Sequence, residues 1–438
     1  MITPRLLALA GALTLPMSAA AQDMPGMKMD PPAPAQEPAQ DHSAHHDMAG
    51  MQDMEGMDMA VPANASPGSG TALLPGAEDG MRGIHIPAGD WMVMLHGALT
   101  AVYTNQGGPR GDDMAFVGSM AMLSASRDLG DSAHIEFRTM MSLEPAMGQK
   151  GYPNLFASGE TAHGRPLVDR QHPHDLFMEL SARVDVDIAK GTSLFVYGGP
   201  VAEPALGPSA FMHRRSDRYF ALSPISHHWF DSTHITYGVV TAGVKARTFQ
   251  IEGSVFNGRE PDEERWNIDT PRLDSWSVRA TWTPTPNWAV QVSTGRLKEP
   301  EATHPGEDER RTTASVHYAR KGLAAMIAFA AKDRVPGETL TAWTGEATWD
   351  LSRHHSIFGR VENVANDELF PDHAAPLHDV KFRVTRFEGG YAYRIPLGDA
   401  ELALGGSVAA YAKPSALDAA YGKAPVSYTL FARLALGQ

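Results

Sequence analysis

The sequence contains no cysteine, and beyond its first residues it has no apolar run long enough to cross a bilayer as a helix. The first absence excludes a fold held together by disulfides and a site built on a thiolate. The second excludes a helical membrane protein, because a spanning helix needs about 20 apolar residues. Basic residues are also fewer than acidic ones, 37 against 51, which argues against a nucleic-acid partner.

The first 21 residues have the pattern of a secretory signal peptide. Arg5 precedes a short apolar run, and the small residues Ala19, Ala20 and Ala21 form a cleavage site before Gln22. We therefore expect residues 1–21 to be a signal peptide and the rest of the chain to be exported. An exported chain without a spanning helix is either soluble or a β-barrel.

Residues 22–88 differ from the rest in composition and are expected to be a disordered tail. Pro, Ala, Gly, Asp and Met dominate, aromatic residues are absent and hydrophobic periodicity is lacking. Such a segment cannot bury enough apolar surface to offset the entropy lost on ordering.

The tail is also rich in side chains that bind soft metal ions. Thioethers suit Cu(I), and imidazoles suit Cu(II) as well, so the pattern predicts binding of a copper ion, or of silver in its place. The alternative is an inert linker, but linkers need no methionine. The predicted ligands, spaced closely enough for a flexible chain to wrap one ion, are Met24, Met27, Met29, His42, His45, His46, Met48, Met51, Met54, Met57 and Met59.

From residue 89 onward, apolar and polar residues alternate over long stretches. The stretch that begins at Trp91 places Val93, Leu95, Leu99 and Tyr103 on one face. Alternation over ten or more residues exceeds the usual globular strand and matches a tilted strand that crosses a bilayer. About sixteen such segments are expected, near 91–104, 114–127, 132–144, 174–187, 191–201, 234–246, 247–258, 272–284, 287–298, 311–321, 322–333, 339–350, 354–366, 379–395, 399–413 and 425–437.

The expected connections alternate between tight turns and long loops, which is the layout of outer-membrane barrels. We therefore predict an all-β fold over residues 89–438: a transmembrane, antiparallel, up-and-down β-barrel of about 16 strands. A soluble sandwich or propeller gives no reason for this alternation. The segment 379–395 loses its alternation near Arg386, which we interpret as a β-bulge.

The order of signal peptide, Met/His-rich acidic tail and barrel resembles the copper-resistance protein B family of outer-membrane proteins. The stretches "DRQHPHDLFMEL", "SHHWFDSTHITYG", "FNGREPDEERWNID" and "RRTTASVHY" look instead like uncharacterised outer-membrane barrel proteins of proteobacteria. The first resemblance implies copper handling, and the second implies only fold and location.

Two long loops carry a second set of candidate metal ligands. Imidazole with carboxylate suits Cu(II), Zn or Ni, whereas inward-folded loops pinned by hydrogen-bonded histidines are the structural alternative. The candidates are His172, His174, Asp175, His227, His228, Asp231 and His234.

The predicted function is that of an outer-membrane barrel that handles copper, with its tail in the periplasm beside a channel-like lumen. Expected partners are outer-membrane lipid, copper ions and periplasmic copper proteins. The alternative is a general or small-solute diffusion porin with an incidental tail, because sixteen strands leave an aqueous lumen. An enzyme is not expected: Ser226 beside His227 is the best nucleophile pair, and neighbouring residues point apart.

Overall fold

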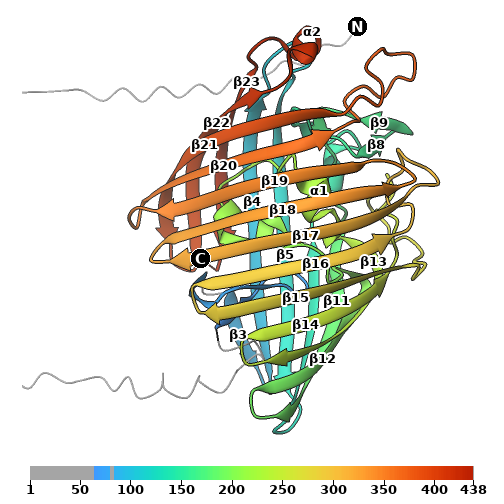
Figure 1. Ribbon diagram of the computed structural model, residues 1–438. Coiled ribbons are helices and arrows are strands. Elements are labelled where there is room, and N and C mark those ends of the chain that lie inside the picture. The colour runs from blue at the N-terminus through green and yellow to red at the C-terminus, as the bar shows by residue number, and fades with distance from the viewer. Residues whose placement is uncertain (1–63, 79–82, 438) are drawn as a thin grey trace, which may run out of the picture. The chain divides into compact units, whose positions relative to one another are not determined.

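The structure, a computed structural model, describes residues 64–78 and 83–437. Sixteen strands form a closed, antiparallel barrel in which neighbours in the chain are neighbours in space (Figure 1). These strands are β4 (Trp91–Asn105), β5 (Asp113–Asp128), β6 (Ala133–Met141), β11 (Phe177–Ala189), β12 (Thr192–Ala202), β13 (Thr236–Ala246), β14 (Phe249–Phe256), β15 (Ser275–Thr285), β16 (Trp288–Leu297), β17 (Asp308–Arg320), β18 (Leu323–Val335), β19 (Thr339–Asp350), β20 (His355–Asn366), β21 (Phe382–Leu397), β22 (Ala400–Ala412) and β23 (Val426–Leu436).

The barrel closes by pairing the last strand with the first. Leu436 to Tyr428 of β23 lie opposite Gly97 to Asn105 of β4. The short strand β3 (Ile84–Ala88) pairs with the first residues of β4 and so continues the line of β23. Closure leaves no unpaired strand edge, which a barrel in a bilayer requires.

Outward-facing side chains are predominantly apolar, as the alternation predicts. Ile327, Val408 and Leu430 are each more than half exposed. Aromatic residues gather near the short turns, where Trp282 stacks on Phe249 with ring centroids 5.9 Å apart. An apolar exterior with aromatic residues at its rim is the surface that a bilayer stabilises.

Inward-facing side chains are charged and paired. Arg279 of β15 donates from Nε to Oε1 of Glu252 at 2.9 Å, and both side chains are fully buried. Arg386 of β21 forms a similar buried pair, in which its Nη2 lies 2.7 Å from Oε2 of Glu388. Such pairs satisfy charges that have lost most of their water.

The connections alternate as expected. One rim carries turns of two to four residues, such as 190–191 and 321–322, and the other carries loops such as 142–176 and 203–235. All sixteen predicted segments overlap a strand, so the expected fold class is confirmed.

The long loops carry short elements of their own. In 142–176 these are η3 (Glu144–Met147), β7 (Tyr152–Pro153), β8 (Glu160–Ala162), β9 (Arg165–Leu167) and β10 (Arg170–Gln171). In 203–235 they are η4 (Phe211–His213), η5 (Arg215–Asp217), α1 (His227–Phe230) and η6 (Ser232–His234). The loop before β23 holds η7 (Ser415–Leu417) and α2 (Asp418–Tyr421). Among the described residues, no helix is both long enough and apolar enough to span a membrane.

The predicted bulge at Arg386 is wrong. Strand β21 pairs with both neighbours without a register shift there, and Arg386 points inward while Phe387 points outward. The alternation looked broken because Phe382 and Val384 also face inward, where they pack against buried loop residues. Shifts in register occur instead in β11, between Phe177 and Glu179 and at two later points, and in β15, between Trp282 and Thr285.

Candidate functional site

The loop 203–235 occupies the interior of the barrel rather than its rim. Most of its residues are buried, and its one α-helical turn, α1, lies within the ring of strands (Figure 1). Arg214 fixes the loop to the wall, because its Nε lies 2.8 Å from Oε1 of Glu346 on β19. The same guanidinium donates to Asp231 Oδ2 at 2.9 Å and to the Ser209 carbonyl at 2.8 Å. The loop therefore narrows the lumen and is held by buried ion pairs.

Residues 64–78 form a second inward segment, in which β1 (Ala65–Pro67) pairs with β2 (Leu73–Pro75) and is followed by η2 (Gly76–Glu78). The Thr71 hydroxyl accepts a hydrogen bond from Arg279 Nη2 at 2.9 Å, and its carbonyl accepts one from Gln250. Ser69 and Ser209 bond to each other, so this segment also contacts the inward loop. Residues 64–78, which fall within the range 22–88 expected to be the tail, thus have buried partners in the barrel.

Glu203 links the two inward segments and gives a prediction about pH. It lies against Gly70, and burial raises its pKa to about 8, more than Arg279 and Ser69 lower it. The unfolded chain ionises this group near its ordinary value of 4.5, whereas the folded chain keeps it protonated up to about pH 8. The free energy of unfolding should therefore fall as the pH rises from about 4.5 to 8, because only the unfolded state releases the proton in that range, and it should level off above pH 8.

The temperature at which the folded gel band disappears should therefore fall between pH 5 and pH 9. In the Glu203→Gln variant, which keeps the shape but cannot ionise, the fall should be smaller. An equal fall in both proteins would contradict this assignment.

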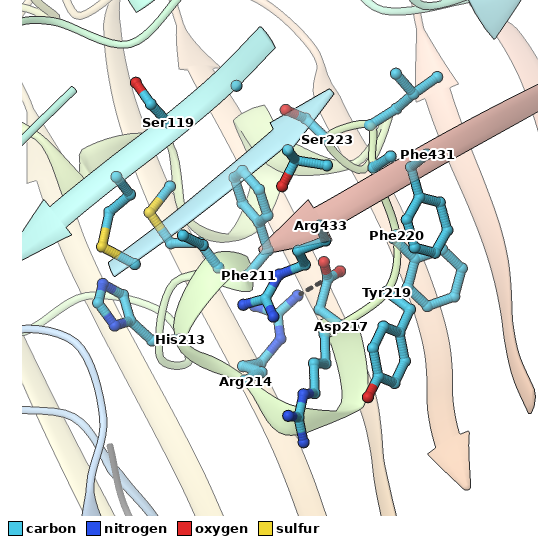
Figure 2. Close-up of a pocket in the computed structure, with 18 of the residues that line it drawn as sticks. Ser119, Phe211, His213, Arg214, Asp217, Tyr219, Phe220, Ser223, Phe431 and Arg433 are labelled. Atoms are coloured by element: carbon cyan, nitrogen blue, oxygen red, sulfur yellow. Dashed lines mark ion pairs between the residues drawn. The ribbon is translucent and has the colours of Figure 1, made fainter. Parts of the chain in front are cut away.

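A cavity of about 210 Å³ lies between the inward loop and strands β4, β5, β11 and β23 (Figure 2). Tyr219, Phe220 and Phe431 lie on one side of the cavity, His213 and methionine sulfur atoms lie on the other, and Arg433 extends between them (Figure 2). The cavity is thus a space inside the barrel with two chemically different walls.

Two of the predicted loop histidines come together with a carboxylate. His172 Nε2 is 2.8 Å from Glu160 Oε1, and His228 Nε2 is 3.8 Å from the same oxygen. One ligand atom from each residue lies within 4.8 Å of the others. Glu260 adds a further carboxylate oxygen 3.5 Å from His228 Nδ1. Two imidazoles and a carboxylate within this span form a donor set that Zn, Ni or Cu(II) accepts.

The electrostatics of the group distinguish its two histidines. Burial lowers the pKa of His172 to about 4, against the attraction of Glu160. Burial also acts to lower the pKa of His228, but Glu260, Glu160 and Glu301 outweigh it and raise the pKa to about 9. Gly159, at φ +109, lies so close that a Cβ there would be 2.8 Å from His228 Nδ1.

The other predicted histidines form a separate, hydrogen-bonded cluster. His227 Nδ1 is 2.7 Å from Asp231 Oδ1, and His234 Nδ1 donates to the Asp231 carbonyl at 2.7 Å. His174 is 2.8 Å from Glu144, and its ring lies 5.3 Å from that of His234. The interactions that the structure shows for these groups fix the fold of the loop.

Asp175 is also separate from the His172–His228 group. Its Oδ2 accepts a hydrogen bond from Arg265 at 3.0 Å, and its Oδ1 accepts one from Tyr237 at 3.2 Å. A carboxylate paired with a buried guanidinium already has its charge compensated, so Asp175 does not need a metal ion to neutralise it.

Sequence reasoning missed Glu160, which lies in the same loop as His172 but twelve residues before it, and Glu260, which lies in the loop between β14 and β15. It also missed a second compact group, Glu301, His304 and Glu368, whose ligand atoms lie within 4.8 Å of one another. Lys332 contacts Glu301, and Arg334 lies 3.4 Å from Glu368, so cationic side chains already neutralise this group.

The nucleophile pair weighed for an enzyme is not formed. The Ser226 hydroxyl donates to Glu362 at 2.8 Å, and His227 is bonded to Asp231 instead. The tail ligands lie outside the described residues and stay predictions: Met24, Met27, Met29, His42, His45, His46, Met48, Met51, Met54, Met57 and Met59.

No model of a known protein family matches the chain, and no curated protein matches it. Solved outer-membrane porins do match the structure. Salmonella typhi OmpF, solved with daunomycin, aligns with a TM-score of 0.52 and 9% identity over 81% of this chain and 100% of that chain. An anion-selective porin from Comamonas acidovorans aligns with a TM-score of 0.50 and 13% identity over 79% of this chain and 100% of that chain. The chain thus has the fold of outer-membrane porins, and its resemblance to copper-resistance proteins stays a prediction.

Proposed function

We propose that this chain is a porin-type channel of the outer membrane whose lumen is narrowed by loop 203–235 and by residues 64–78. The observation that carries this proposal is a closed sixteen-strand barrel with an apolar exterior, a charged interior and a loop folded inward. Barrels of 16 strands are wide enough for an aqueous path, and inward loops set what passes through it.

The same proposal includes location and orientation. Outward-facing apolar side chains and rim aromatics favour outer-membrane lipid as the partner. The short turns are typical of the periplasmic side, so the tail at residues 22–63 would extend into the periplasm after residues 1–21 are removed.

The channel is tested by incorporating the full chain into planar lipid bilayers. We expect discrete conductance steps smaller than those of an unobstructed sixteen-strand porin, because two segments occupy the lumen. The proposal would be overturned if the protein is fully folded, as judged by heat-modifiable migration on gels, and yet conducts no ions even when the inward loop is loosened.

A second candidate function is copper handling. It is supported by the Met/His-rich tail and by the Glu160, His172 and His228 group, whose ligand atoms lie within 4.8 Å of one another. Soft thioethers suit Cu(I), while imidazoles with carboxylate suit Cu(II), so the two regions would hold different oxidation states. In this proposal the tail captures copper ions or receives them from periplasmic copper proteins.

The tail is tested in the full chain by changing its eight methionines (Met24, Met27, Met29, Met48, Met51, Met54, Met57 and Met59) to Leu. We call this protein the tail variant. We expect it to lose most of the Cu(I) capacity measured by titration under reducing conditions, because Leu has no donor atom. If the tail variant and the wild type bind equal amounts of Cu(I), the tail has no part in copper handling.

A further inference from the structure

A row of methionines crosses the inner face of four neighbouring strands. Met94 on β4, Met122 on β5, Met140 on β6 and Met178 on β11 are each at most 9% exposed and pack in one cluster. Met120 and Met212 pack against the same cluster. Another apolar cluster on the inner wall, around Leu340 and Phe382, contains only one methionine, Met326, so the concentration of thioethers here needs its own explanation.

The strand register places Met122 and Met140 side by side with His96, and Met94 lies two residues before His96 on β4. His96 lies directly opposite Met122, and Met122 lies opposite Met140. Paired residues on one face of a sheet have Cβ atoms about 5 Å apart, so neighbouring side chains touch. Met178 joins the row because the register shift between Phe177 and Glu179 turns it inward. The barrel wall thus forms a continuous strip of sulfur donors ending at an imidazole.

The inward loop covers part of this strip with two more donors. Met212 and His213, at the end of η4, line the cavity together with His96, Met120 and Met178. Figure 2 shows His213 beside methionine sulfur atoms, on the side of the cavity away from Phe220 and Phe431. Thioether and imidazole groups from the wall and from the loop therefore face one space.

The imidazole of His213 has a feature that close packing does not explain. Both of its ring nitrogens are buried, and neither has a hydrogen-bond partner among the described residues. A buried polar atom without a partner is costly, so such atoms call for an explanation. Burial, with the nearby His96 and Arg138, lowers the pKa of His213 to about 3, which leaves the ring neutral at neutral pH. Neutral imidazole is the form that binds metal ions.

We propose that His213 and the methionines that line this cavity, Met120, Met178 and Met212, bind a soft monovalent cation, Cu(I) or Ag(I), inside the barrel. Thioethers are soft, uncharged donors that favour Cu(I) over Zn, Ca or Mg, and one imidazole completes a mixed sulfur and nitrogen set. This site is distinct from the tail and from the Glu160, His172 and His228 group. It does not depend on the channel conducting ions.

Ag(I) is the probe, because it is soft, monovalent and stable in air. The full-length tail variant is loaded with Ag(I), passed through a desalting column and assayed for bound silver by mass spectrometry. We expect about one retained equivalent. Adding Met178→Leu and Met212→Leu should weaken retention at least about tenfold, because two donors are lost while side-chain volume is kept. His213→Phe should do the same.

The matched control changes two other methionines, Met147→Leu and Met326→Leu, which pack in separate clusters. We expect it to retain silver like the tail variant. The proposal is overturned if the tail variant retains no silver, or if the site and control variants retain it equally, as methionines that only fill space would do. Conductance of the same preparations tests the channel separately, so failure of one proposal is distinguishable from failure of the other.

Discussion

Replacing Arg214 by Ala should raise the single-channel conductance severalfold while the barrel stays folded. Arg214 joins Glu346 of the wall to Asp231 and Ser209 of the inward loop, and all these charged groups are buried. Removing one partner of a buried ion pair typically costs about 3–5 kcal/mol, because the remaining charges are uncompensated. Here the loop can respond by leaving the lumen, which lets water reach Glu346 and Asp231 and widens the path.

The measurement is conductance in planar bilayers, with heat-modifiable migration on gels as the check on folding. Arg320→Ala serves as the matched control, because Arg320 is an exposed arginine at the short-turn end of β17. The barrel itself should persist in both variants, since its stability depends on closed strand pairing and outward apolar side chains. Wild-type conductance in a folded Arg214→Ala protein would show that the loop does not restrict the path.

The strands could be predicted from sequence because their side chains alternate between lipid and interior with a period of two. Val184 and Val186 of β11 follow this rule and face outward. The rule fails where the register shifts: Met178 is six residues before Val184 and so would share its outward face, yet beside the register shift it is buried inside. Sequence periodicity cannot reveal a bulge whose position depends on the neighbouring strand.

The interior could be predicted only in part, because it is built by contacts between distant segments. The sequence indicated that two loops gather histidines, but not which ones meet. His172 and His228 share Glu160, whereas His174 and His234 pack together with His227. Nor did composition reveal that Thr71, within an apparently linker-like stretch, accepts a hydrogen bond from buried Arg279. Each of these contacts depends on how the closed barrel places loops over one another.

Because the histidines form two separate groups, we expect variants of the two groups to have opposite effects. The double variant His172→Ala with His228→Ala should lose metal retention and keep a normal lumen. It removes two of the three candidate ligands and leaves only Glu160. An incomplete set of ligands leaves an ion partly solvated, and affinity should fall by at least about tenfold. The measurement compares the full-length tail variant with and without these two changes. It is the amount of Zn(II) or Cu(II) that each protein retains after desalting.

The matched double variant, His174→Ala with His227→Ala, should do the reverse. It removes the hydrogen bond to Glu144 within loop 142–176 and the hydrogen bond to Asp231 within loop 203–235. The carboxylates are then left buried without these partners, which favours movement of the loops into water. We expect a nonselective rise in permeability to small sugars in liposome swelling, with metal retention unchanged. If both variants instead leak equally and neither loses metal, His172 and His228 are structural as well, and copper handling would rest on the tail and the methionine-lined cavity alone.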